Sequence, residues 1–257
     1  LYRRYPPPFR LFELYTYRHA SAGLAGNADA VDVLRRKGFR KRVEVIPQFG
    51  VDPEIFAPGR APSDSERPPT IGYYGRLVPE KGVDTLIDAI ALLPHHPRLV
   101  IVGAGESLDD LKARASARGL GNRVTFRGTM PSAKIPAFLH ELDVVVVPSR
   151  TRPNWKEQFG RVIVEAMSCG VPVVGSDSGE IPNVIGDAGL TFAEGDVAAL
   201  AMQLGKLLND PSLRSGLSEA GRQRVLAQYT QRQIAAQTVE LYREVIGTPG
   251  PQDEVDG

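Results

Sequence analysis

The sequence has 257 residues, of which 42% are hydrophobic and 24% charged, and its formal net charge is +1. This is an ordinary globular composition, long enough for one large α/β domain or one and a half smaller ones. The near-zero charge offers no case for binding nucleic acid with the whole chain, the single cysteine excludes an intramolecular disulfide, and no apolar run is long enough to span a membrane.

The segment before residue 70 contains short elements followed by a linker. We predict an amphipathic helix over residues 9–17, a turn-rich segment over residues 21–27 that covers a strand end, a helix over Asp29–Lys37 closed by Gly38, and a strand over Val43–Pro47. Proline and small residues between Gln48 and Arg67 have linker composition, and we place the linker at residues 57–69. Because the chain opens at Leu1 within a helical pattern, we expect a front portion to be absent.

Six basic residues gather around the end of the second predicted helix: Arg35, Arg36, Lys37, Arg40, Lys41 and Arg42. One interpretation is a helix C-terminus followed by a solvated turn, since basic residues favour the last turn of a helix. The other is a patch for an anionic membrane surface or a phosphate-bearing acceptor. We favour the first.

From residue 70 onward, β and helical patterns alternate regularly. Predicted strands cover 70–74, 99–102, 123–126, 143–149, 171–175 and 189–192. Predicted helices cover 83–93, 107–118, 132–142 with Ser132 as its cap, a segment from about Gly160, 196–208, 211–229 and 231–246. This alternation predicts an α/β fold, an open parallel sheet with helices on both faces. Residues 249–257 form a polar tail with no packing signal.

The central stretch is EQFGRVIVEAMSCG, residues 157–170, which lies between two strand patterns. A strand–loop–helix–strand unit places a ligand outside the carboxyl ends of a parallel sheet. Glu165 falls about one and a half turns into the predicted helix, while Glu157 stays on the loop that enters it. Two carboxylates in this arrangement suit the hydroxyls of a sugar and a ribose, so we predict a nucleotide-sugar site.

Three glycine-containing loops follow predicted strands. In Gly75–Gly82, Arg76 and Lys81 would neutralise a diphosphate, although this loop taken alone favours two surface cations beside a turn. Gly103-Ala104-Gly105 lacks the third glycine of a dinucleotide fingerprint because residue 108 is leucine, but it fits a turn facing phosphate or sugar. The loop of residues 175–182 offers hydroxyls and amides to phosphate or sugar oxygens, or else caps the helix after it. The four histidines are scattered, so we predict no metal site.

Together these pieces resemble the retaining glycosyltransferases of family 4 (glycosyl transferases group 1), which have the GT-B fold of two facing Rossmann-like domains. The resemblance covers residues 43–246 and is carried by IPQFGVD (46–52), GRLVPEKGVDTLIDA (75–89), VGAGES (102–107), FRGTM (126–130), PSR (148–150), EQFGRVIVEAMSCGVPVVGSDSGEIP (157–182) and IGDAGL (185–190). Two departures are the loop of residues 151–156, which lengthens the spacing before Glu157, and Asn183, where the family often has glutamate.

The resemblance implies roles for individual residues. Arg76 and Lys81 contact the donor diphosphate, Glu165 the ribose, Glu157 the hydroxyls of the transferred sugar, and the backbone around Met130 the base. Further donor-binding positions are Gly75, Gly103, Gly105, Ser149, Phe159, Gly160, Ser178 and Gly179. The donor is a UDP- or GDP-sugar, with no cofactor and no metal, and the acceptor is a glycan, a lipid-linked sugar or a small molecule.

The resemblance also implies a domain organisation. Residues 1–56 would be the end of an otherwise missing N-terminal acceptor-binding domain, residues 70–230 the donor-binding domain, and residues 231–248 a helix crossing back to the acceptor domain. A cytoplasmic location, at the cytoplasmic face of a membrane, would suit such an enzyme. Two other functions fit the same residues, a nucleotide-sugar 2-epimerase and a non-catalytic nucleotide-sugar-binding module.

Overall fold

The computed structural model describes residues 6–59, 67–94 and 96–247. The chain divides into two compact units, one made of residues 51–227 and the other of residues 1–50 with 228–257. We describe each unit by itself. The predicted tail at 249–257, most of the predicted linker and His95 lie outside the described residues.

The larger unit is built on a six-stranded sheet in which every neighbouring pair is parallel. Its order is β5-β4-β3-β6-β7-β8, with β3 at Thr70–Tyr74, β4 at Arg98–Val102, β5 at Val124–Phe126, β6 at Val144–Val147, β7 at Val173–Ser176 and β8 at Leu190–Phe192. The order reverses between β3 and β6, and a doubly wound sheet binds ligands at such a switch point. The predicted fold class is confirmed.

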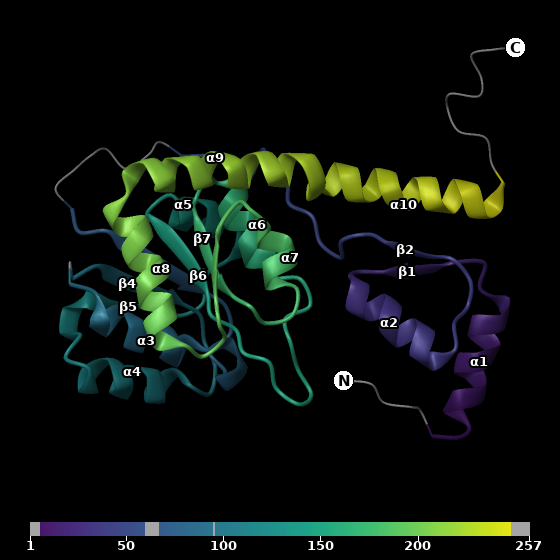
Figure 1. Cartoon of the computed structure of the whole chain (residues 1–257), viewed down its shortest axis with the longest axis horizontal. Coiled ribbons are helices and arrows are strands. Elements are labelled where there is room, and N and C mark those ends of the chain that lie inside the picture. Colours follow the sequence, from purple (N-terminus) through teal and green to yellow (C-terminus); the bar gives the residue numbers. More distant parts are fainter. Residues whose placement is uncertain (1–5, 60–66, 95, 248–257) are drawn as a thin grey trace, which may run out of the picture. The chain divides into compact units, whose positions relative to one another are not determined.

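Helices cover both faces of this sheet (Figure 1). They are α3 (Val83–Leu92), α4 (Leu108–Ala117), α5 (Ile135–Leu139), α6 (Arg161–Ser168), α7 (Ile181–Ile185), α8 (Val197–Asn209) and α9 (Pro211–Gln228). On one face, α3, α4 and α8 pack around Ile71, Ile101 and Val146 in one hydrophobic cluster. All four residues of β6 are buried, which explains its uninterrupted valine run, since a strand covered on both faces has no solvent side.

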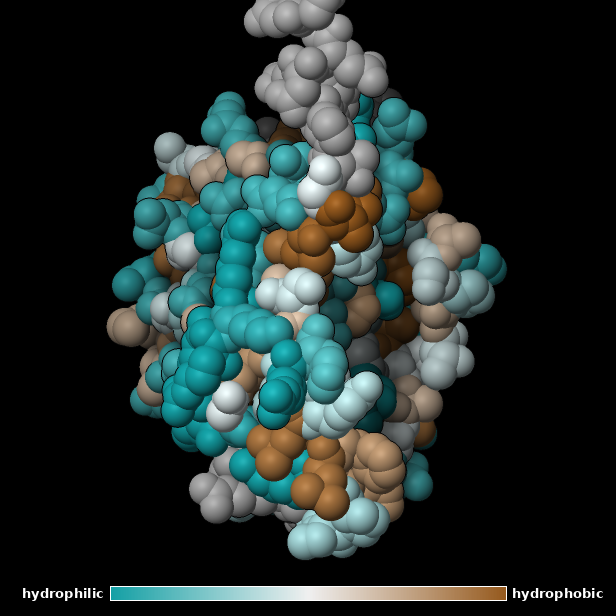
Figure 2. Space-filling model, turned by 90° about the vertical axis from the view of Figure 1, so that its right-hand side faces the viewer, coloured by the Kyte–Doolittle hydropathy of each residue, from teal (hydrophilic) through white to brown (hydrophobic). Residues whose placement is uncertain are grey.

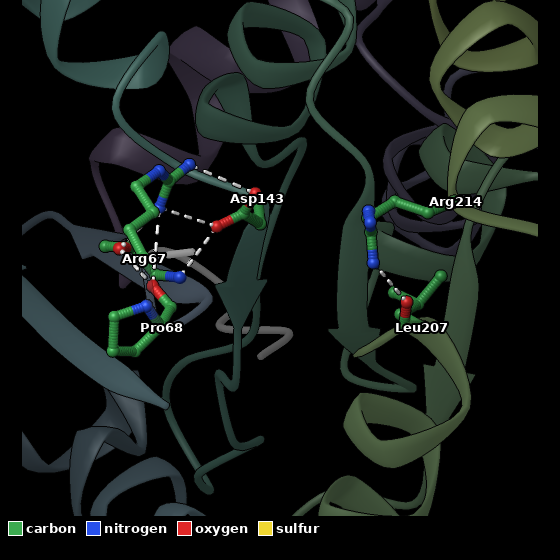
Figure 3. A network of polar contacts seen from close by, with 6 residues as sticks. Arg67, Pro68, Asp143, Leu207 and Arg214 are labelled. Carbon is green, nitrogen blue, oxygen red and sulfur yellow. Dashed lines mark hydrogen bonds and ion pairs between the residues drawn. The ribbon is translucent and has the colours of Figure 1, made fainter. Parts of the chain in front are cut away.

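A partly buried ion pair links the amino ends of the two central strands (Figure 3). Arg67 binds Asp143 with both terminal nitrogens, at 3.0 and 3.2 Å, and the same carboxylate accepts from the amide of Thr70 at 2.7 Å. On the other side of the view, Arg214 of α9 donates to the carbonyl of Leu207 in α8 at 2.9 Å. The contacts of Arg67 and Asp143 lie at the amino ends of β3 and β6, so they leave the carboxyl ends of these strands free for loops.

In its described residues, the smaller unit has a two-stranded parallel sheet and three helices: β1 (Gly23–Ala25), β2 (Val43–Val45), α1 (Phe9–His19), α2 (Ala28–Lys37) and α10 (Gln231–Ile246). The ends of α2 and the start of α10 follow their sequence signals. Asn27 caps α2 by accepting from the amide of Ala30, Gly38 closes it with φ 102°, and Thr230 with Gln233 forms a capping box for α10. No residue of α1 is buried, and it exposes several large apolar side chains. Figure 2 shows hydrophobic side chains in separate groups among hydrophilic ones.

Most side chains of the basic cluster at residues 35–42 make hydrogen bonds or ion pairs within the smaller unit. Arg35 donates to the carbonyl of Lys41 at 2.6 Å, Lys41 donates to the carbonyls of Arg18 and Ala20, and Lys37 pairs with Glu13 at 2.6 Å. The Arg35 bond is that of a helix C-terminus and its following turn, the interpretation that we favoured, whereas Lys37 and Lys41 bind α1 and the residue that follows it. Contact with a membrane surface stays a prediction. Within the described ranges, no helix has the length and apolar character needed to cross a bilayer.

Two local predictions were wrong. Residues 21–27 contain β1, which the glycine- and alanine-rich sequence hides because its strand signal comes only from pairing with β2. The helix expected over 132–142 is the short α5, preceded by a 3-10 turn at Ser132–Lys134, and Ser132 makes no capping bond. Pro136 lies in the first turn of α5, where its missing N–H is tolerated, so the helix starts later than predicted.

Candidate functional site

Three loops meet at the carboxyl ends of the strands around the switch point. They follow β3, β6 and β7, and they bring together Lys81, Ser149 and Glu157 in the larger unit. In the β3 loop, the hydroxyl of Tyr73 donates to the carbonyl of Arg76 at 2.7 Å, and a 3-10 turn at Pro79–Lys81 ends at Gly82, whose φ is 65°. This turn fixes the backbone from which the Lys81 side chain extends.

Lys81 and Glu157 form the centre of the site. Lys81 Nζ lies 2.6 Å from Glu157 Oε2 and 4.9 Å from the centroid of the Trp155 ring. The same Oε2 accepts from the hydroxyl of Ser149 at 3.1 Å. The side chains of Lys81 and Glu157 are only 20% and 13% exposed, so the pair is partly shielded from solvent. A cation, a carboxylate and a hydroxyl in one shielded place can bind a phosphate and the hydroxyls of a sugar.

The β7 loop supports Glu157 through its backbone. The amide of Glu180 donates to the carbonyl of Glu157 at 3.0 Å. Gly179 has φ 58°, and a Cβ on it would lie 2.1 Å from that carbonyl oxygen. Ser178 is buried and its hydroxyl lies 3.0 Å from that of Thr151. Glycine is therefore required here by the close packing of two loops.

Glycine is required in the β3 and β4 loops for the same reason, close packing of one backbone against another. Gly103 has φ 149°, and a Cβ would lie 1.9 Å from the carbonyl oxygen of Gly75; a Cβ on Gly105 would lie 2.2 Å from that of Leu77. The β3 and β4 loops thus touch backbone to backbone. Their donor-binding role stays a prediction, as does that of half-buried Met130 in the loop after β5.

The structure keeps Arg76 apart from the Lys81–Glu157 pair. The side chain of Arg76 is 65% exposed and reaches Glu80 at 3.8 Å. This weak surface pair leaves the guanidinium available to a ligand. Its contact with a diphosphate stays a prediction.

Glu165 occupies a second, more buried position. Gly160 precedes α6 with φ 79°, Phe159 is buried beside it, and Glu165 lies one turn into the helix. Its Oε2 accepts from the hydroxyl of Tyr74 at 2.9 Å and its Oε1 lies 3.0 Å from Arg161 Nε. Burial raises the pKa of Glu165, while the Tyr74 hydrogen bond and the Arg161 charge oppose the rise.

Sequence reasoning missed the roles of Tyr74 and Arg150. The amide of Arg150 donates to the carbonyl of Glu80 at 2.7 Å, and its Nη2 lies 2.8 Å from Asp84 Oδ2 and also bonds the hydroxyl of Thr85. Arg150 therefore clamps the β3 loop and the start of α3 to the end of β6. The partners of both residues are far away in the sequence, so no local pattern signals them.

The part of the chain that the structure describes has no cluster of side chains suited to binding a metal ion. No three His, Cys, Asp or Glu side chains there lie close enough together to hold a metal ion. The prediction that no metal takes part in the reaction remains untested.

Comparison with known proteins identifies the family of this chain. A family described as glycosyl transferases group 1 matches residues 59–224. The GDP-mannose-dependent α-(1-6)-phosphatidylinositol monomannoside mannosyltransferase of Mycolicibacterium smegmatis is 35% identical over 201 residues, covering 76% of this chain and 53% of the relative. The 2-deoxystreptamine glucosyltransferase of Streptomyces kanamyceticus is 31% identical, covering 80% of this chain and 55% of the relative.

Solved structures also share this fold. Sucrose-phosphate synthase from Thermosynechococcus elongatus has a TM-score of 0.79 at 29% identity, covering 93% of this chain and 62% of that one. Anabaena HepE in complex with UDP has a TM-score of 0.80 at 26% identity, covering 89% of this chain and 65% of that one. This chain spans about half the length of the curated relatives that it matches.

Proposed function

The chain belongs to the glycosyl transferases group 1 family, and from that premise we propose that it supplies the donor-binding part of a retaining, family 4 glycosyltransferase. The observation that carries the proposal is the meeting of Lys81, Ser149 and Glu157 at the switch point of the sheet. A nucleotide-sugar needs a cation for its diphosphate and acceptors for its hydroxyls in neighbouring positions, and these loops supply both.

The proposed roles follow from the position of each side chain. Lys81 and exposed Arg76 receive the diphosphate, Glu165 holds a ribose hydroxyl, and Glu157 holds a hydroxyl of the sugar. During transfer, the bond between the anomeric carbon and the diphosphate oxygen breaks while the acceptor oxygen bonds to that carbon on the same face. The acceptor proton passes to the departing diphosphate. Lys81 stabilises the negative charge that develops on the leaving group.

This scheme needs no covalent intermediate on Glu157. Its Oε2 already accepts from Lys81 and Ser149, which lowers its reactivity as a nucleophile and suits it to accept from a sugar hydroxyl. The similar proteins suggest guanine and uracil as candidate bases of the donor. One relative is named for GDP-mannose, and one similar solved structure is in complex with UDP. We propose that the donor is a UDP- or GDP-sugar and the acceptor a hydroxyl of a glycan, lipid-linked sugar or small molecule.

The test is product analysis with the full-length protein. Incubated with a UDP- or GDP-sugar and acceptors, the protein should form a glycoside whose anomeric configuration, read by NMR, is that of the donor. An inverted product contradicts retention. A 2-epimerised sugar nucleotide formed without acceptor favours the epimerase instead, and donor binding with no turnover favours a non-catalytic binding module.

A further inference from the structure

Tyr74 is the last residue of β3 and lies inside the larger unit. Its ring packs edge-on against Phe138 of α5, with ring centroids 6.1 Å apart and an interplanar angle of 85°. The hydroxyl lies 2.9 Å from Glu165 Oε2 and 3.2 Å from the carbonyl of Val162. The Tyr74 side chain is held in one position, because its ring contacts Phe138 and its hydroxyl is hydrogen-bonded to α6.

The two oxygens of Glu165 have different surroundings. Oε2 faces inward to Tyr74, whereas Oε1 is paired with Arg161, whose side chain is 59% exposed. The inner partner is fixed by the core, while the outer partner is a long side chain at the surface that can move into solvent without loss of packing. A ligand can therefore replace Arg161 at Oε1 but cannot replace Tyr74 at Oε2.

The protonation states suit this arrangement. Burial raises the pKa of Tyr74 well above its ordinary value, and the charge of Glu165 raises it further. The phenol therefore stays protonated and donates its hydrogen. A buried carboxylate that lost this donor would be left with an unsatisfied oxygen, which is costly in a site closed to water.

We propose that Tyr74 is a positioning residue of the donor site, which anchors Glu165 Oε2 so that Oε1 is the atom offered to a ribose hydroxyl in place of Arg161. The inference rests on the proposed function, in which Glu165 holds the ribose. It adds a residue that touches no ligand itself and that sets the direction from which the ribose is bound.

The test compares ribose with a ribose that lacks its hydroxyls. UDP, GDP and their 2′,3′-dideoxy analogues are titrated calorimetrically into the full chain as wild type, Tyr74→Phe and Glu165→Gln. The readout is the ratio of the two dissociation constants for one base. Both titrations use the same sample, so a partly unfolded fraction lowers the stoichiometry of both and leaves the ratio unchanged.

The matched control is Tyr73→Phe. It removes a neighbouring buried hydroxyl, which donates to the carbonyl of Arg76 and not to Glu165. If Tyr73→Phe weakens nucleotide binding, it should do so by the same factor for the ribose and the dideoxyribose ligands. Tyr74→Phe should instead weaken the ribonucleotide by about 10-fold and the dideoxy analogue by less than about 2-fold. The double variant Tyr74→Phe/Glu165→Gln should show the same ratio as Glu165→Gln alone.

The outcomes separate the inference from the function on which it rests. A wild-type preference for ribose that survives in Tyr74→Phe overturns the positioning role and leaves the donor site standing. Equal binding of ribose and dideoxyribose ligands by the wild type overturns the role of Glu165 itself. Binding of no nucleotide at all contradicts the donor site, and the inference falls with it.

Discussion

Lys81 Nζ and Glu157 Oε2 are 2.6 Å apart, although 76 positions separate the two residues in the sequence. The cation that would bind the diphosphate is therefore neutralised by the carboxylate that would hold the sugar. A bound nucleotide-sugar must share or replace this contact, so the two subsites are linked through one ion pair. Changes to either partner should affect diphosphate binding and sugar transfer differently.

Glu157→Gln should separate binding from transfer. Without the carboxylate charge, Lys81 is released to the diphosphate, so UDP or GDP should bind roughly twofold to fivefold more tightly. Transfer by the full-length protein should fall about 100-fold because the sugar loses its positioning acceptor. Glu219→Gln, on the exposed surface of α9, is the control and should change neither quantity. Weaker nucleotide binding in Glu157→Gln would show that Glu157 does not compete for Lys81.

Gly179→Ala should destabilise the fold and disturb Glu157. The new Cβ would lie 2.1 Å from the carbonyl oxygen of Glu157 at a φ of 58°. We expect a loss of about 1–3 kcal/mol in the free energy of unfolding, measured with urea. Gly216→Ala is the matched control, because its Cβ meets nothing within 4 Å and the residue lies in helix α9. That control should stabilise by about 0.5–1 kcal/mol. Similar effects of both substitutions would contradict the packing argument.

Asp88 should contribute stability that depends on pH. Burial raises the pKa of its carboxyl, but hydrogen bonds from Arg114 and Arg118, each at 2.9 Å, outweigh burial and the net shift is downward. A carboxyl whose pKa is lowered by folding stabilises the folded state above its unfolded value of about 3.9 and loses this effect as the pH falls through the lowered pKa.

Asp88→Asn should therefore cost about 2 kcal/mol in the free energy of unfolding at pH 7. The difference from wild type should shrink toward pH 2.5, which urea unfolding at a series of pH values would follow. Asp109→Asn serves as the comparison, because that side chain is 96% exposed. A cost for Asp88→Asn that does not change with pH would argue against the two-arginine clamp.

Cys169 should be unreactive in the folded protein. Burial raises the pKa of its thiol to about 12, with the charge of Arg222 opposing the rise, so almost no thiolate exists at pH 8. Iodoacetamide should label the protein slowly in buffer and completely in urea, as mass spectrometry would record. Labelling in buffer at the rate of a free cysteine would mean that the end of α6 opens readily.

Local patterns predicted most elements because the sheet is covered on both faces. The run at Val144–Val147 has a strong, short-range signal, and the helix predicted at Gln231–Ile246 was observed with the same bounds. The strand β1 was missed because Gly23 and Ala25 have little strand preference and its partner β2 comes about 20 residues later. A pairing between distant segments leaves no local periodicity.

In the candidate site, too, contacts between residues far apart in the sequence could not be predicted. The glycine loops and the two carboxylates were visible as residue types and spacings. The structure brings Lys81, Ser149 and Glu157 together, while their donor-binding roles stay predictions. The hydrogen bond between Tyr74 and Glu165 was not predictable, because a tyrosine in a strand pattern is ordinarily a core residue. Arg76 lies at the surface, a side-chain direction that spacing does not specify.

The most direct test of the donor site is a calorimetric titration of the chain with UDP and GDP, with and without magnesium, on wild type, Lys81→Ala and Lys112→Ala. Lys112 is the control, a half-exposed lysine whose nearest carboxylate is 3.8 Å away. We expect one nucleotide to bind without magnesium, Lys81→Ala to weaken it about 10- to 100-fold, and Lys112→Ala to leave it unchanged. Equal binding by wild type and Lys81→Ala would contradict the account.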